Sequence, residues 1–392
     1  MSEAVETQTI SETALRRSPL EETHVRAGAL SREQDGCVVV ASYGDARAEY
    51  ETVRGGGSAG LFDLSSRGRV EVSGGEAVQF LNGMLTNDVA RLEEGAWMHA
   101  AFPNPQGRLV ASVRVFRRGG TFLFDTEPAT HEKVFKTLER FTLAGDFRVR
   151  DVTGETALLS LQGERAGETV RSSLGEEAAN VSRGRVVAAR FQEGEVAVAR
   201  ATHTAEDGFD LFVSAADAGG LWDALVAAGA RPTGFDALEV LRVEAGVPRY
   251  GVDASDANVV LEVVDEAEAV SYTKGCYAGQ EIIARIHWRG HVAKKLAGLV
   301  FARETEPPAD ARVRSCEEGG REVGRITSTV FSPRLSRRVA LGLVKHDHLA
   351  PGTEVKIFDG ETEICRAHVG ELPLVRGSWY AERVEGAEEP GG

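Results

Sequence analysis

Long apolar runs are absent from this chain of 392 residues. No stretch reaches the roughly 18 consecutive apolar residues that a membrane-spanning helix needs. Residues 1–17 are polar and acidic and lack the apolar core of a secretory signal. We therefore expect a cytoplasmic protein with no membrane partner, in which residues 1–17 form a flexible leader.

Cysteine is also scarce, and its spacing excludes the usual thiol frameworks. No Cys-x-x-Cys pair occurs among the four cysteines, which are Cys37, Cys276, Cys316 and Cys365. A disulfide network or a zinc site is therefore not expected. The sequence His346-Asp347-His348 has no third ligand nearby and predicts a turn, so we expect no metal site. No glycine-rich segment fits a phosphate-binding loop.

Positive charge is in deficit, because the formal net charge is -15. Such a surface disfavours general binding of nucleic acid. One local exception is the basic and aromatic run over residues 285–295, which includes Trp288. This run could contact phosphate, stack on bases or hold a small molecule with a glutamate tail. It is equally compatible with a solvated basic edge on an acidic protein.

Apolar spacing over residues 77–85 predicts an amphipathic helix. The apolar residues recur at i, i+3, i+4, i+7 and i+8 and form one face: Ala77, Phe80, Leu81, Met84 and Leu85. Ser73 and Glu76 before this segment have the spacing of a capping box. Farther along the chain, Asp217 and Asp236 are expected to cap two more helices.

A β-hairpin is predicted after the turn at residues 104–107, which has proline and glycine at type I positions. Residues 109–116 alternate as a strand does, and Gly119-Gly120 leads into a partner strand over residues 121–124. No carboxylate lies between Asn104 and Phe116, so we expect no general base in this segment. These patterns predict two interleaved α+β domains within residues 18–295.

From residue 296 the pattern changes to short alternating runs separated by Gly, Pro and Asp. The runs lie at residues 299–301, 312–314, 324–329, 339–344, 355–358 and 365–369. They predict a small antiparallel barrel over residues 296–384. Residues 385–392 are acidic and rich in glycine, which predicts a disordered tail.

The densest group of reactive side chains lies at residues 274–281, with the sequence KGCYAGQE. Cys276 stands two residues after Lys274, and nearby cations favour the reactive thiolate. A lone cysteine is more often a small buried apolar residue. The polar neighbours, and the glycines Gly275 and Gly279, indicate an exposed turn instead. We therefore predict Cys276 and Lys274 as the catalytic pair.

The octapeptide resembles the KGCYxGQE signature of YgfZ-type proteins, which are folate-binding relatives of the glycine cleavage T-protein, an aminomethyltransferase. Other segments look like T-protein superfamily blocks: residues 59–65, 85–89, 208–213, 242–248, 324–333 and 340–344. The resemblance implies an α+β fold in which three domains, two α+β and one barrel, form a ring around a tetrahydrofolate site.

The same resemblance implies which residues bind the folate. Asp210 matches an acidic residue that would hydrogen-bond the pterin, and Arg242 and Tyr250 would line the same region. Asn104 would bring its hairpin against the folate. Gln280 and Trp288, in and after the octapeptide, complete the expected cofactor-binding residues.

Two departures from the T-protein pattern bear on the activity. T-proteins carry paired aspartates where this chain has Ala111 and Ser112, and an Asp-Phe-x-Gly block where it has residues 276–279. The predicted function is therefore a tetrahydrofolate-binding accessory factor for iron–sulfur cluster assembly or repair, with assembly or client proteins as partners. The alternatives are a folate-dependent aminomethyltransferase and a tRNA-modification factor.

Overall fold

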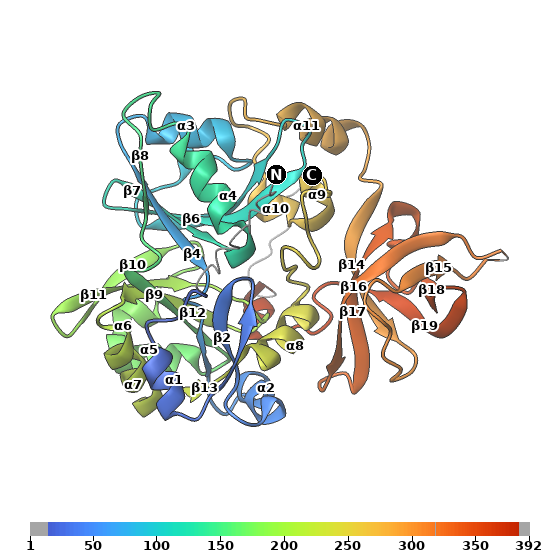
Figure 1. The fold of residues 1–392 in the computed structure, drawn as a ribbon, viewed down its shortest axis with the longest axis horizontal. Coiled ribbons are helices and arrows are strands. Elements are labelled where there is room, and N and C mark those ends of the chain that lie inside the picture. The colour runs from blue at the N-terminus through green and yellow to red at the C-terminus, as the bar shows by residue number, and fades with distance from the viewer. Residues whose placement is uncertain (1–14, 318, 384–392) are drawn as a thin grey trace, which may run out of the picture.

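The computed structural model describes residues 15–317 and 319–383, which form three bodies around a common centre (Figure 1). Two are α+β units that lie one above the other, and the third is a β-barrel beside them. The predicted fold class is therefore confirmed. The expected tail and most of the expected leader lie outside the described residues. Within the leader, Arg16 already pairs through its backbone with Gly36 and Val38.

The first α+β body contains an antiparallel sheet of five strands in the order β5-β6-β7-β4-β8. Its strands are β4 (Gly68–Ser73), β5 (Ala96–Pro103), β6 (Leu109–Arg118), β7 (Thr121–Thr126) and β8 (Arg148–Asp151). Helices α3 (Ala77–Met84) and α4 (Pro128–Glu139) contribute Leu81 and Val134 to the core beneath it. The predicted hairpin is present as the antiparallel pair β6 and β7. The predicted turn at residues 104–107 is present too, because the amide of Gly107 donates to the carbonyl of Asn104 over 2.9 Å.

The capping box expected before α3 is wrong. Residue Glu76 is itself the N-cap of α3, and no side chain caps this helix. The Glu76 carboxylate instead accepts from the amide of Asp146 over 2.7 Å, which ties the start of α3 to the strand that follows α4. A tertiary contact has therefore replaced the local cap.

The second α+β body is built on a sheet of six strands in the order β10-β11-β12-β9-β3-β13. Its strands are β3 (Gly60–Asp63), β9 (Thr156–Gln162), β10 (Val186–Phe191), β11 (Gly194–Arg200), β12 (Gly208–Ser214) and β13 (Arg231–Pro232). The chain leaves this sheet after β3, builds the whole first sheet, and returns at β9. The two units are thus interleaved in sequence.

Helices cover both faces of this second sheet, so its central strands are buried on both sides. One face packs on α5 (Ala166–Leu174) and α7 (Ala218–Ala227), and the other on α2 (Ala46–Arg54) and α8 (Phe235–Ala245). Around them lie α1 (Glu21–Arg26), α6 (Glu176–Ala179) and the hairpin of β1 (Leu30–Gln34) and β2 (Cys37–Ser42).

Two predicted helix caps in this body differ from the structure. Asp217 does occupy the N-cap of α7, but its side chain makes no cap hydrogen bond and accepts from the hydroxyl of Ser214 instead. Asp236 lies inside the first turn of α8, where Gly234 is the N-cap. Each acid still lies near the positive end of its helix, where negative charge is favourable.

The third body is a closed barrel in the strand order β14-β17-β16-β15-β18-β19. Its strands are β14 (Lys294–Phe301), β15 (Arg312–Ser315), β16 (Glu322–Ser332), β17 (Arg337–Lys345), β18 (Glu354–Asp359) and β19 (Thr362–Gly370). Each strand contains one of the six runs predicted from the sequence. Closure pairs every strand on both sides and leaves no exposed sheet edge.

Short helices join the barrel to the α+β bodies. They are α9 (Val260–Val263), α10 (Glu266–Ala269) and α11 (Gln280–Arg289). Short 3-10 helices lie elsewhere: η1 (Val89–Arg91) before β5, η2 (His346–His348) between β17 and β18, and η3 (Ser378–Arg383) after the barrel. The predicted turn at residues 346–348 is thus η2. Among the described residues, no helix combines the length and apolar character that a membrane span requires.

One buried carboxylate joins the second α+β body to the barrel. Glu244, at the end of α8, is fully buried. It accepts from Tyr50 over 2.9 Å and pairs with Arg54 over 2.9 Å, both on α2. The hydroxyl of Ser332, at the end of β16, also donates to it. Three elements from two bodies therefore depend on one charge.

We predict that Glu244→Ala lowers the free energy of unfolding by about 3–5 kcal/mol, because it leaves Arg54 as a buried charge without this partner. Chemical denaturation followed by circular dichroism measures this change. The control is Glu51→Ala on the exposed face of α2, whose ion pair with Arg47 is worth about 0–1 kcal/mol. Equal losses in the two variants would contradict the prediction.

Candidate functional site

A cavity of about 800 Å³ lies where the three bodies meet. Residues of all three bodies line it, together with the connecting segments. From the first sheet and its helix come Trp97, His99, Ser112, Arg114 and Glu127, from α8 come Glu239 and Arg242, and from the segments toward and beyond the barrel come Tyr250, Lys295 and Leu372. Cavities of this size suit ligands as large as a typical cofactor.

Strand β6 supplies the central wall of this cavity. Successive side chains of a strand point to opposite faces. Ala111 and Val115 therefore lie in the core of the first sheet, while Ser112 and Arg114 face the cavity and the second body. Farther along the same face, Phe116 packs edge-on against Phe212 of β12, with ring centroids 4.9 Å apart.

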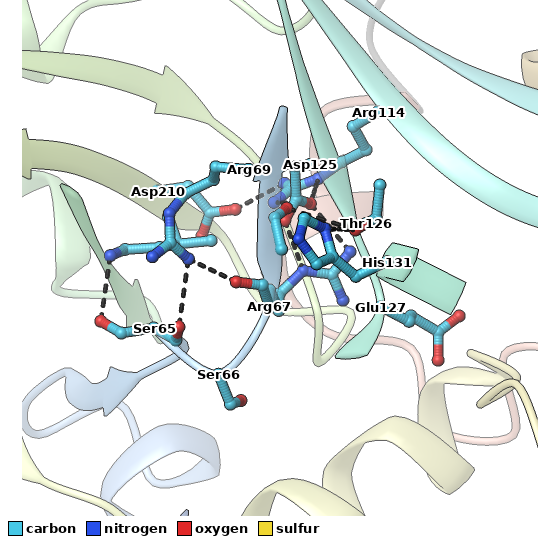
Figure 2. Close-up of polar contacts among 12 residues, drawn as sticks. Ser65, Ser66, Arg67, Arg69, Arg114, Asp125, Thr126, Glu127, His131 and Asp210 are labelled. Atoms are coloured by element: carbon cyan, nitrogen blue, oxygen red, sulfur yellow. Dashed lines mark hydrogen bonds and ion pairs between the residues drawn. The ribbon is translucent and has the colours of Figure 1, made fainter. Parts of the chain in front are cut away.

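Arg114 is the centre of a buried charge cluster behind the cavity wall (Figure 2). Its Nε donates to Asp125 over 2.8 Å, and its Nη1 donates to Asp210 of β12. Arg67 reaches the other oxygen of Asp125 over 2.7 Å. His203 completes the cluster, with its Nε2 3.0 Å from Asp210. The cluster thus joins the two sheets through charge-assisted hydrogen bonds.

These partners keep both carboxylates ionised. Burial alone would raise the pKa of Asp210, but its interactions with His203 and Arg114 outweigh burial and lower the pKa well below its usual range. The pKa of Asp125 is lowered in the same way, against burial, by Arg67 and Arg114. Burial likewise opposes the charge of Arg114, but its two acids raise the pKa of the guanidinium overall.

Two of the predicted cofactor-binding residues line the cavity. Arg242 is buried, and its guanidinium donates to Asp253 over 2.6 Å and to Ser328 of β16 over 2.7 Å. Tyr250 stands nearby, with Lys133 5.2 Å from its ring centroid. Asp210 is the third expected residue of this region, but it lies behind Arg114 and does not border the cavity.

The structure does not bring the other predicted binding residues to this cavity. Asn104 uses its side chain to accept from the amides of Gln106 and Arg108 within its own turn. Gln280 accepts from the amide of Tyr277 over 3.3 Å. Trp288 lies on α11 and is 70% exposed. The basic run is therefore divided, because Trp288 lies on the outer surface while Lys295 at its end lines the cavity.

Cys276 and Lys274, the predicted catalytic pair, also lie outside the cavity. Cys276 is exposed and borders a shallow surface hollow next to α3. Lys274 is buried, and its Nζ donates to the carbonyls of Asn82, Leu85 and Asn87 over 2.7, 2.6 and 2.9 Å. Burial lowers the pKa of Lys274 to about 8. Its amine therefore holds the end of α3 in place and does not serve the thiol.

Sequence reasoning missed the charged residues that do surround the cavity, namely Arg67, Arg114, Glu127 and His203. One signal was present, because Ser112 and Arg114 alternate with the apolar residues of the predicted strand. The prediction considered carboxylates only up to Phe116. Asp125, near the end of the second strand of the hairpin, and Glu127, just after it, were not predicted as site residues.

Comparison with known proteins identifies two domains in this chain. Residues 20–264 match the GCVT N-terminal domain, and residues 294–375 match the glycine cleavage T-protein C-terminal barrel domain. An aminomethyltransferase from Rubrobacter xylanophilus is 36% identical, over 84% of this chain and 87% of its own length. One from Geobacillus kaustophilus is 32% identical, over 92% of this chain and 99% of its own length.

A solved structure supports the same fold. The glycine cleavage system aminomethyltransferase T from Bartonella henselae superposes with a TM-score of 0.80. It covers 92% of this chain and 98% of its own, at 23% identity. The superfamily expected from the sequence is confirmed, and tetrahydrofolate as the expected cofactor agrees with it, because aminomethyltransferases of this kind use tetrahydrofolate.

The predicted function, an accessory factor for iron–sulfur cluster assembly, is wrong. The curated relatives are named aminomethyltransferases, and they match nearly the whole chain. The prediction gave decisive weight to Cys276, which the structure places on the outer surface, away from the cavity. No group of three or more His, Cys, Asp and Glu side chains in the described part of the chain could hold a metal ion.

We predict that Lys274→Met destabilises the protein and that Cys276→Ser does not. The first leaves three carbonyls without their common donor, which costs about 1–3 kcal/mol. The second changes an exposed side chain and is expected to stay within about 0.5 kcal/mol. Chemical denaturation of the two variants in parallel measures both values. A large loss in Cys276→Ser would contradict the placement of this thiol.

The charge cluster predicts a loss of stability in acid. Because the pKa of Asp210 is lowered on folding, its ionised form stabilises the protein above the ordinary carboxyl range of about 4, and this contribution is lost as pH falls through the folded value. Asp210→Asn should therefore be less stable than the unsubstituted protein at pH 7, and the difference should narrow toward pH 3. Urea denaturation across this range measures it. A difference that does not change with pH would contradict the assignment.

Proposed function

Because the chain belongs to the GCVT family of glycine cleavage T-proteins, we propose that it is a folate-dependent aminomethyltransferase whose substrates meet in the central cavity. The observation that carries the proposal is the place of the cavity. It lies at the junction of the two α+β bodies and the barrel, and each of them contributes to its walls. Ligand sites commonly form where domains meet.

The lining of the cavity fits tetrahydrofolate. A pterin is flat, and Trp97 and Tyr250 offer aromatic surface. Its amino and ring N–H groups need acceptors, and the carboxyl groups of Glu127 and Glu239 face the same space. The acidic tail of a folate needs cations, and Lys295 is one of those that line the cavity. When bound, tetrahydrofolate supplies the nitrogen atoms that accept a one-carbon unit.

The residues of this chain contribute position and charge. Asp125 and Asp210 hold Arg114 in the wall beside Ser112, so the wall next to the ligand is rigid. Arg242 of α8 donates to Ser328 of β16 and thereby joins the second α+β body to the barrel. This contact fixes the positions of two walls of the cavity relative to each other. A preorganised site loses little free energy to rearrangement when substrate binds.

Within the family, the octapeptide at residues 274–281 and the neutral residues at positions 111 and 112 support a place on the YgfZ-type branch. The activity proposed for this branch member follows the relatives, whose names describe aminomethyl transfer. Under this proposal Cys276 takes no part in the transfer.

The test combines a binding assay with an activity assay. The purified protein is titrated with tetrahydrofolate by calorimetry, and formation of methylene-tetrahydrofolate is followed with an aminomethylated lipoyl carrier protein. Saturable binding together with transfer is expected. A protein that binds tetrahydrofolate but does not transfer the unit would overturn the enzymatic proposal.

We predict that Ser112→Trp weakens binding of tetrahydrofolate by about ten- to a hundredfold, because overfilling a packed site costs about 1–3 kcal/mol. Ser112 borders the cavity and makes no contact within the charge cluster, so the fold should persist. The control is Leu30→Trp, at a position that is 61% exposed. Unchanged affinity in Ser112→Trp would place the ligand elsewhere.

A further inference from the structure

Several acidic side chains border the cavity, but most already have strong partners. Glu239 pairs with Arg242 and with Arg249. Glu262 accepts from the amide group of Asn258 over 2.8 Å. These carboxylates are already engaged by donors or cations, and they are poorly placed to exchange a proton with a ligand.

The remaining acids at the cavity are also engaged or lie at its edge. Asp265 caps α10 by accepting from the amide of Ala267 over 3.0 Å. Glu268 lies 3.7 Å from His99. Asp35 is an exposed turn residue. Among the lining acids that the structure describes, this leaves Glu127, whose carboxyl group accepts from a backbone amide.

Glu127 follows the last residue of β7 and lines the same cavity as Ser112. Strands β6 and β7 pair with Val113 opposite Thr126, so one further step of this register sets Ser112 opposite Glu127. Glu127 keeps an extended backbone, with φ -65° and ψ 148°. The next residue, Pro128, disfavours helical geometry at Glu127 and therefore helps to keep its backbone extended. Residues paired across two strands have Cβ atoms about 4.5–5.5 Å apart.

The carboxyl group of Glu127 is fixed at one oxygen. Its Oε2 accepts from the amide of Tyr250 over 2.8 Å, and both residues line the cavity. Within the described residues, Oε1 makes no hydrogen bond. In Figure 2 the carboxyl group of Glu127 points away from the Arg114 cluster. The geometry leaves one oxygen that can carry a proton at the cavity surface.

The surroundings of Glu127 favour the protonated form. Burial raises its pKa above the ordinary range, and this outweighs the charge of Arg67, the amide of Tyr250 and the charge of Arg242, all of which lower it. Asp125, two residues earlier on β7, adds to the rise. Lys133 of α4 is directed at the Tyr250 ring and hydroxyl. A buried carboxyl with a raised pKa is suited to acid catalysis near neutral pH.

We propose that Glu127 is the proton-transfer residue of the cavity, which holds a proton on Oε1 and delivers it to a substrate bound against Ser112. This inference rests on the proposed function and names the acid for it. Position 112 on β6 holds a serine and cannot supply an acid. Glu127, which follows the neighbouring strand β7, supplies it instead.

The proposed step moves one proton from Glu127 to the leaving group of the substrate. When the bond between the one-carbon unit and its leaving heteroatom breaks, the electron pair stays on that heteroatom, which takes the proton from Oε1. The resulting carboxylate is stabilised by the amide of Tyr250 and by the charges of Arg67 and Arg242. The new bond forms to a nitrogen of tetrahydrofolate, whose proton is lost to water, and water returns one proton to Glu127 after product release.

The first test is Glu127→Gln, which keeps an oxygen to accept from Tyr250 and removes the proton. We expect kcat to fall by about 10²–10⁴-fold, the usual contribution of a positioned acid. The loss of rate with rising pH that marks the acid should vanish in this variant. The matched control is Glu132→Gln, an exposed acid of α4 outside the cavity. A variant with unchanged kcat and pH profile overturns the proposal.

Two further measurements separate this inference from the proposed function. Difference infrared spectra should contain the C=O band of a protonated carboxyl above pH about 4.3, the ordinary value for Glu, and Glu127→Gln should lack it. Absence of this band in the unsubstituted protein overturns the inference even if the protein is active. If the unsubstituted protein shows the band but no transfer, the proposed function fails instead.

The double variant Ser112→Asp with Glu127→Gln moves the carboxyl to the opposite strand at nearly the same place. Recovery of at least part of the lost kcat supports a positioned acid. Loss of the fold in the single variant would appear as a lower unfolding midpoint, so the midpoint is measured for each variant. A double variant that folds and stays as slow as Glu127→Gln contradicts the positional argument.

Discussion

The ion pairs of Arg114 with Asp125 and Asp210 determine how the two α+β bodies meet. Asp125 belongs to the first sheet and Asp210 to the second, so one guanidinium bridges them. Removing a single member would leave an uncompensated buried charge, which proteins tolerate poorly. The relative position of the two sheets, and with it the shape of the central cavity, therefore depends on this cluster.

The same cluster decides what the cavity wall offers to a ligand. Asp210 lies in the strand where the family resemblance implied a pterin-binding acid, but here its charge is shared by Arg114 and His203. The carboxyl groups that line the cavity belong instead to residues such as Glu127 and Glu239. Arg114 lies on the same strand face as Ser112. A substitution at position 114 would therefore also change which carboxyl groups are free to act at the cavity.

Much of the fold could be predicted because its signals are local. The alternation in the six runs after residue 296 follows from strands that bury one face in a barrel, and all six strands formed. The apolar face of α3 and the hairpin at residues 104–107 depend on neighbouring residues in the same way. The caps at Ser73 and Asp236 failed because tertiary partners replaced the local ones, such as the Glu76 contact with Asp146.

The sequence alone determined the superfamily and the α+β and barrel architecture, and it singled out Arg242 and Tyr250, which line the central cavity. Only the tertiary structure decided that Cys276 and Trp288 face outward, that Lys274 binds three carbonyls, and that Glu127 lines the same cavity as Ser112. Those outcomes depend on strand register and on contacts between residues up to about two hundred positions apart, such as Lys274 with Asn82, at a separation of 192. A charged side chain can bind a ligand, cap a helix or form a buried ion pair, and the residues around it in space determine which of these roles it takes.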